Sequence, residues 1–106
     1  MALDFPRVVC LCGSTRFMTA FQEANLRETL AGKIVLSVGC NTQTDADLGL
    51  TAEQKTAADV LHKQKIALAD EILVLNINGY IGESTRLEIE FAKAAGKTIR
   101  YLESNE

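Results

Sequence analysis

The 106-residue sequence has no long apolar run and no excess of positive charge. No stretch approaches the ~18 consecutive apolar residues that a membrane-spanning helix requires, so we expect no membrane partner. The segment from Met1 to Arg7 lacks the basic-then-apolar order of a signal peptide. Eleven Lys and Arg residues stand against fourteen Asp and Glu residues, with no basic block, which argues against a nucleic-acid polymer as partner.

Cysteine, histidine and proline are also scarce. Three cysteines, Cys10, Cys12 and Cys40, form an odd set with two members in one apolar run, which indicates reduced thiols in a cytoplasmic protein. A single histidine, His62, and the absence of a Cys-x-x-Cys pair argue against a structural zinc site. We expect Cys12 to be an apolar filler rather than a nucleophile. We expect His62 to be a packed or half-exposed helix residue, because nothing in the sequence pairs with it.

Strand-like and helix-like patterns alternate along the whole chain, without a low-complexity linker, so residues 1–106 are expected to form one domain. The patterns predict four strands and three helices: strands at 8–12, 33–38, 72–75 and 98–102, and helices at 17–31, 51–69 and 84–95. This order predicts an α/β fold, a small Rossmann-like or flavodoxin-like three-layer structure with a parallel sheet ordered 2-1-3-4. A capping box at Thr51–Gln54 and glycine stops at Gly32 and Gly96 delimit the helices.

The triplet Ser-Thr-Arg occurs twice, at residues 14–16 and 84–86, each time between a predicted strand and a predicted helix. The predicted strand order brings both junctions to the carboxyl edge of the sheet, where ligands of α/β proteins bind. Hydroxyl groups, free backbone N–H groups and a guanidinium suit a phosphorylated ligand. The alternative is that Gly13–Arg16 forms only a tight turn and an N-cap. The first junction matches neither a dinucleotide-binding glycine motif nor a Walker loop, which argues against dinucleotide and triphosphate ligands.

The last predicted helix separates its two central glutamates. A helical wheel at ~100° per residue places Glu88 on the inward arc and Glu90 on a charged, solvated arc. The inward arc also holds Leu87, Phe91, Ala92, Ala94 and Ala95, and the charged arc holds Arg86, Lys93 and Lys97. A carboxylate held at the ligand edge suits a nucleophile or a general base. The alternative for Glu88 is structural, because Thr85–Glu88 matches a capping box.

Two motifs resemble the nucleoside 2-deoxyribosyltransferase-like family, which includes nucleoside 5′-monophosphate N-glycosidases. The first predicted strand and the loop at residues 12–16 are similar to the family's Gly-Ser-x-Arg substrate loop. The second motif is Ala69–Ile72, a glycine loop, then Glu88 ahead of Gly96-Lys97, similar to a catalytic glutamate that precedes a Gly-Lys pair. The string from Gly79 to Arg86 more closely resembles a group of short uncharacterised bacterial and phage proteins.

The resemblance implies cleavage or transfer at the N-glycosidic bond of a nucleotide or nucleoside, with a (deoxy)nucleoside 5′-monophosphate as the expected substrate. Glu88 would attack the anomeric carbon as the catalytic nucleophile, without a metal or another cofactor. Asp45 and Asp47 are the candidates for the acid that protonates the leaving base. The expected substrate-binding residues are Gly13, Ser14, Thr15, Arg16, Asn76, Gly82, Ser84 and Thr85.

Two other classes of function stay open at this stage. A non-catalytic nucleotide-binding or sensor module is favoured by Asn76, which stands where relatives often carry an acid near the base. An interaction protein whose sheet is completed by a partner chain is the third possibility, because an open sheet has two exposed edges. A homo-oligomer is therefore expected under every hypothesis. Tyr80 is either a lid residue that stacks on a base or an anchor of its loop.

Overall fold

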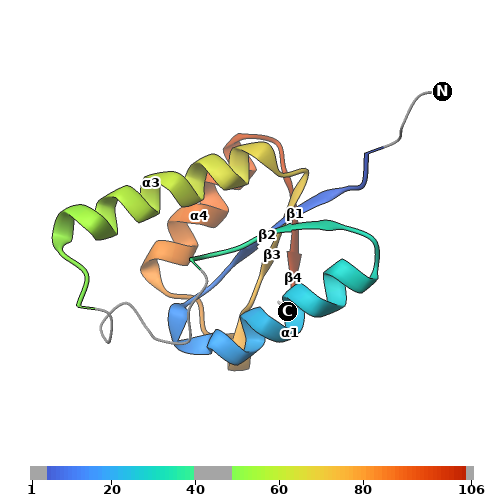
Figure 1. Cartoon of the computed structure of the whole chain (residues 1–106), viewed down its shortest axis with the longest axis horizontal. Coiled ribbons are helices and arrows are strands. Elements are labelled where there is room, and N and C mark those ends of the chain that lie inside the picture. The colour runs from blue at the N-terminus through green and yellow to red at the C-terminus, as the bar shows by residue number, and fades with distance from the viewer. Residues whose placement is uncertain (1–4, 40–48, 105–106) are drawn as a thin grey trace.

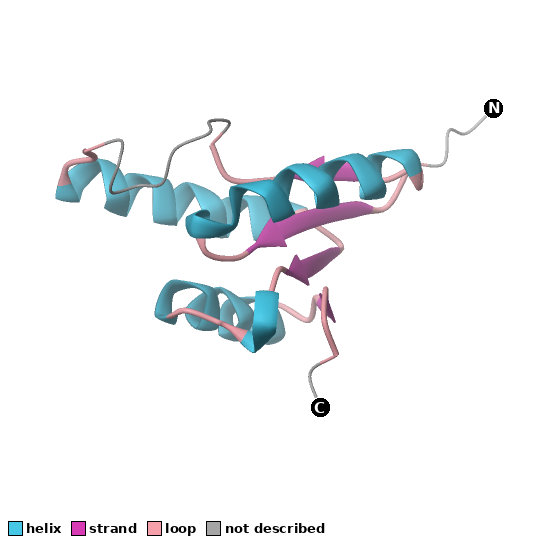
Figure 2. Ribbon diagram, turned by 90° about the horizontal axis from the view of Figure 1, so that it is seen from below, coloured by secondary structure: helices cyan, strands magenta, loops and turns pink. Residues whose placement is uncertain are grey.

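The computed structural model describes residues 5–39 and 49–104, which form a parallel sheet between two helical layers (Figures 1 and 2). The sheet has four strands in the order β2-β1-β3-β4, as predicted. The strands are β1 (Val8–Cys12), β2 (Ile34–Leu36), β3 (Glu71–Val74) and β4 (Thr98–Tyr101). The described helices are α1 (Met18–Leu30), α3 (Ala52–Leu68) and α4 (Glu83–Ala94), with 3-10 turns η1 (Thr15–Phe17) and η2 (Ile77–Gly79). Within the described ranges, no helix is long and apolar enough to cross a membrane.

The two faces of the central strands bury two separate apolar clusters. Along β1, Val9 and Leu11 face α1, whereas Cys10 and Cys12 face α3 and α4. This alternation follows from the two-residue period of a strand. All four side chains are fully buried, so helices on both sides of the sheet exclude solvent from β1. The continuous apolar run is therefore confirmed as a strand covered on both faces.

The capping box and the two glycine stops that the sequence predicts are present at the ends of the helices. The Thr51 hydroxyl accepts from the Gln54 amide at 3.1 Å, and the Gln54 side chain accepts from the Thr51 amide at 3.0 Å, which completes the predicted capping box. Gly32 and Gly96 follow α1 and α4 with φ values of 89° and 73°, a region that glycine adopts without strain.

The alternative for Glu88, a capping box at Thr85–Glu88, is wrong. Helix α4 begins at Glu83 after an N-cap at Gly82 that makes no side-chain bond, and Thr85 is a buried residue inside the first turn. The wheel is also rotated relative to the prediction, because Leu87, with 44% of its surface exposed, is not on the buried face, and Ala94 and Ala95 are exposed as well. The buried face is Thr85, Ile89 and Ala92, and Glu88 lies beside it. Glu88 still points inward on the rotated wheel, as predicted.

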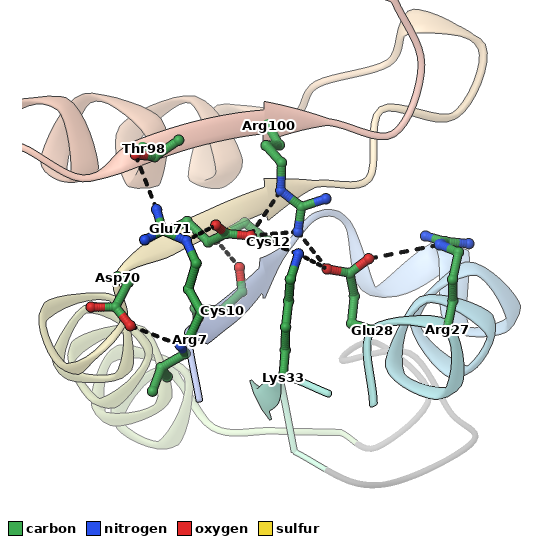
Figure 3. A network of polar contacts seen from close by, with 11 residues as sticks. Arg7, Cys10, Cys12, Arg27, Glu28, Lys33, Asp70, Glu71, Thr98 and Arg100 are labelled. Atoms are coloured by element: carbon green, nitrogen blue, oxygen red, sulfur yellow. Dashed lines mark hydrogen bonds and ion pairs between the residues drawn. The ribbon is translucent and has the colours of Figure 1, made fainter. Parts of the chain in front are cut away.

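Strand β3 begins one residue earlier than predicted, at a buried carboxylate. Glu71 keeps only 4% of its side chain exposed, on the α1 face of the sheet, where it is surrounded by cations (Figure 3). Arg100 approaches Glu71 to 2.6 Å, Lys33 lies at 3.4 Å, and Arg7 is also hydrogen-bonded to it. Burial raises the pKa of Glu71, but hydrogen bonds from Arg7 and Arg100 outweigh it and hold this pKa below its ordinary value.

Candidate active site

Both Ser-Thr-Arg junctions border one cavity of about 510 Å³ at the carboxyl edge of the sheet. The loop after β1 forms one wall, the first turns of α4 form a second, and α3 forms a third. Seven of the nine residues predicted for the site line it: Gly13, Ser14, Thr15, Gly82, Ser84, Thr85 and Glu88. The predicted strand order accounts for this meeting, because β1 and β3 are neighbours and end together.

The first junction is a tight turn that brings the end of β1 close to its neighbour. A side chain at Gly13 would place its Cβ 3.1 Å from the Cβ of Leu75, a tight contact that would push Leu75 away by a few tenths of an ångström. The Ser14 hydroxyl caps η1 by accepting from the Arg16 amide at 3.3 Å. The loop therefore forms the tight turn and N-cap of the structural alternative, and it also lines the cavity.

Arg16 and Asn76 do not line the cavity. The Arg16 guanidinium lies 4.4 Å from the ring centroid of Tyr80, a cation–π contact. Asn76 is 1% exposed, and its amide group donates to the Glu103 carbonyl at 3.1 Å and accepts from the Glu103 amide at 2.9 Å. In this structure Asn76 therefore tethers the segment after β4 to the loop after β3.

Tyr80 lies between the two junctions and lines the cavity. Its ring meets Phe17 edge-to-face at a centroid distance of 5.9 Å, and Arg16 covers it. A side chain at Gly82 would place its Cβ 3.1 Å from the Tyr80 hydroxyl, so the loop folds back on this ring. The structure thus supports the loop-anchor interpretation, and Tyr80 as a residue is 40% exposed.

Glu88 projects from α4 toward a cluster of buried side chains on α3 and β1. Its Oε1 lies 3.6 Å from Nε2 of His62, and its side chain is 15% exposed. The same His62 nitrogen lies 3.5 Å from the Cys12 sulfur and 3.8 Å from the Cys10 sulfur. Two buried atoms of the group, Glu88 Oε1 and His62 Nδ1, have no hydrogen-bond partner among the described residues.

The buried cluster shifts the acidity of each of its members. The hydrogen bond from Cys12 and the contact with His62 lower the pKa of Cys10 to about 6, although burial opposes this. The pKa of Cys12 is raised by the same hydrogen bond and by burial. Burial lowers the pKa of His62, but the adjacent Cys10 and the charge of Glu88 outweigh it and raise the pKa. Burial raises the pKa of Glu88, and the neighbouring His62 opposes that shift.

Sequence reasoning missed the partners of His62 and a second carboxylate. His62 is a packed helix residue, one of the two positions expected for it. The sequence did not indicate that Cys10, Cys12 and Glu88 would surround it. Asp59, three residues earlier on α3, lines the cavity, and its charge contributes to the raised pKa of Glu88. The spacing of Asp59, His62 and the buried Ile66 marks one helix face and was the available signal. Asp45 and Asp47 lie outside the described residues.

The sequence matches no model of a known protein family, and no curated protein shows significant similarity to it. The side chains around the cavity therefore carry the functional assignment.

Proposed function

We propose that the protein breaks the N-glycosidic bond of a nucleoside 5′-monophosphate, with Glu88 as the nucleophile. The observation that carries this proposal is the position of Glu88 in a cavity that it shares with a helix N-terminus and with a second carboxylate, Asp59. Two carboxyl groups on one sugar site are what double displacement at an anomeric carbon requires. The volume of about 510 Å³ is in the range of small-molecule sites.

In the first step, a Glu88 oxygen forms a bond to C1′ of the sugar while the bond from C1′ to the base breaks. The electron pair of that bond leaves with the base, which takes a proton from the carboxyl group of Asp59. In the second step, Asp59 removes a proton from water, the water oxygen bonds to C1′, and the bond to Glu88 breaks. A second base in place of water gives transfer rather than hydrolysis.

The remaining lining groups provide places for the phosphate and the base. The first turn of α4 presents N–H groups that have no acceptor within the helix, and Ser84 lies among them. A phosphate at this helix start gains both the hydrogen bonds and the helix dipole, and Ser14 faces it from the other junction. The Tyr80 ring, held by Arg16 and Phe17, offers a surface on which a base stacks.

The test is a panel of ribo- and deoxyribonucleoside 5′-monophosphates, with free base separated by chromatography. We expect release from at least one nucleotide, and a loss of at least about 10³-fold in the rate for Glu88→Gln. Glu90→Gln is the matched control, because Glu90 is on the same helix but lies on the exposed arc beside Arg86. Full activity of Glu88→Gln would contradict the proposal. Thermal stabilisation by a nucleotide without any release would instead indicate the non-catalytic binding module.

The expected homo-oligomer also stays a prediction. Strand β2 is one edge of the sheet, and three large apolar residues are exposed on it and on the adjoining α1: Ile34 at 41%, Leu26 at 60% and Leu30 at 77%. A strand edge with exposed apolar neighbours favours self-association. Light scattering coupled to size-exclusion chromatography measures the mass, and a monodisperse monomer would contradict this expectation.

A further inference from the structure

Four potential metal-binding side chains from three elements converge beside the cavity. Cys10 and Cys12 occupy alternate positions of β1 and therefore face the same side of the sheet, toward α3. His62 enters from α3, and Glu88 enters from the early turns of α4. The ligand atoms of the two cysteines and the histidine all lie within 4.8 Å of one another.

The distances between these atoms match the edges of a tetrahedral zinc site. Bond lengths of about 2.3 Å to sulfur and 2.0 Å to nitrogen give a sulfur–nitrogen edge of about 3.5 Å in a tetrahedron. The sulfurs of Cys12 and Cys10 lie 3.5 Å and 3.8 Å from Nε2 of His62. The Oε1 of Glu88 lies 3.6 Å from the same nitrogen, slightly longer than the corresponding nitrogen–oxygen edge of about 3.3 Å. An ion therefore fits between the two sulfurs and Nε2 of His62, whose ligand atoms all lie within 4.8 Å of one another. Glu88 lies outside this group of three, so its carboxylate would have to move inward to complete the tetrahedron.

A second observation points to a ligand at this place. Oε1 of Glu88 is a buried carboxylate oxygen without a hydrogen-bond partner among the described residues. A buried acceptor without a donor is costly, and an ion bound between the two thiols and the imidazole would supply its missing partner. Cys10 and Cys12 are fully buried, and the His62 side chain is 8% exposed, so a bound ion would be shielded from water.

We propose that Cys10, Cys12, His62 and Glu88 bind a thiophilic divalent cation, of which Zn²⁺ is the best match. Two sulfurs, one imidazole nitrogen and one carboxylate oxygen form a zinc-like donor set and disfavour Mg²⁺ and Ca²⁺. Sequence reasoning argued against zinc because no Cys-x-x-Cys pair is present. On a strand, however, a Cys-x-Cys pair brings both thiols to one face. The Cys-x-x-Cys spacing used to recognise zinc sites does not include two cysteines on alternate positions of a strand.

The proposed metal site shares Glu88 with the proposed nucleotide chemistry. An ion that is bound by Glu88 occupies the carboxylate that the glycosidic reaction requires. Zn²⁺ at the site is therefore expected to suppress base release, and a chelator is expected to restore it. Because metal binding is measured without any nucleotide, a failure of one proposal leaves the other standing.

The test is titration of the metal-free, reduced full chain with Co²⁺, followed by displacement with Zn²⁺. We expect one equivalent of Co²⁺ to produce thiolate charge-transfer bands and the intense visible bands of tetrahedral cobalt, and Zn²⁺ to abolish them. At a hundredfold excess of free Zn²⁺ over the Kd, the Tm is expected to rise by about 10 °C. Absence of thiolate-to-cobalt bands in the wild-type chain would overturn the proposal.

Variants assign the ligands. Cys12→Ser and His62→Gln are expected to lose more affinity than the 10- to 100-fold that is typical when a group behind a ligand is removed. Glu88→Gln is expected to weaken binding and change the visible bands while the thiolate bands remain. Glu90→Gln is the matched control for Glu88→Gln, because Glu90 lies on the exposed arc beside Arg86, and it is expected to bind as the wild type does. Far-ultraviolet circular dichroism establishes that each variant is folded. Loss of binding in Glu90→Gln, or unchanged binding in folded Cys12→Ser, would overturn the assignment.

Discussion

Replacing Glu71 by glutamine tests one of two buried carboxylates that each pair with three cations in the described structure. The substitution keeps the shape of the side chain and removes its charge. Arg7, Lys33 and Arg100 would then surround a neutral amide, with Glu28 as the remaining carboxylate of the network (Figure 3). Glu71 is 4% exposed, so water cannot replace the lost charge.

The size of the loss follows from the burial of the partners. Removing one member of a fully buried ion pair costs about 3–5 kcal/mol. The cations around Glu71 are less buried, with side-chain exposures of 48% for Arg7, 24% for Lys33 and 36% for Arg100, and solvent therefore screens part of the effect. We expect a loss of about 2–4 kcal/mol in the free energy of unfolding. For a domain of this size the Tm would fall by roughly 10–20 °C.

Urea denaturation monitored by circular dichroism measures the loss directly. Glu90→Gln is the matched control, since it makes the same chemical change in an exposed pair in which Arg86 lies at 3.0 Å. We expect no measurable effect from this control, because exposed ion pairs contribute little. A Glu71→Gln variant as stable as the control would refute the account of the buried network.

Three further outcomes follow from the described contacts. Hydrogen bonds to cations outweigh burial and hold the pKa values of Glu28 and Glu71 below their ordinary values, so their stabilisation is present above the unfolded pKa of about 4.3. It is lost as the pH falls through the lowered pKa values; urea midpoints that do not decrease with acidification below pH 4.3 would argue against this pairing. Thr51→Ala removes the cap of α3 and is expected to cost about 1 kcal/mol in urea denaturation, whereas no change would show that the cap is unimportant. Asn76→Ala breaks two hydrogen bonds to Glu103 and is expected to lower the unfolding free energy by about 1–3 kcal/mol; an unchanged value would mean that this tether contributes nothing.

The order of the strands was predictable because alternating apolar runs and helical patterns allow few topologies in a chain of this length. Buried strands, glycine stops and the Thr51 cap are local signals, and the structure contains each of them. The strand limits were less predictable. Glu71 is a carboxylate and was left out of β3, yet ion pairs from residues 29 and 64 positions away make its burial favourable.

Part of the cavity was predictable from the order of the strands and the period of the last helix. Chain order places Ser14 and Ser84 at neighbouring strand ends, and periodicity places Glu88 inward. What local patterns do not contain is how α3 lies across the sheet. That packing brings His62 against Cys12 and sets Asp59 beside the cavity. The helical spacing marks the face that Asp59 and His62 share, but it does not indicate what that face contacts.

The most direct test of the central claim is intact-protein mass spectrometry during turnover of a nucleotide from which the protein releases the base. A Glu88 nucleophile predicts a covalent intermediate whose mass exceeds that of the chain by one sugar-phosphate group, with the added mass on a peptide that contains Glu88. The Glu88→Gln chain should show no such adduct. Base release with the added mass on another residue, or release that continues in Glu88→Gln, would contradict the account.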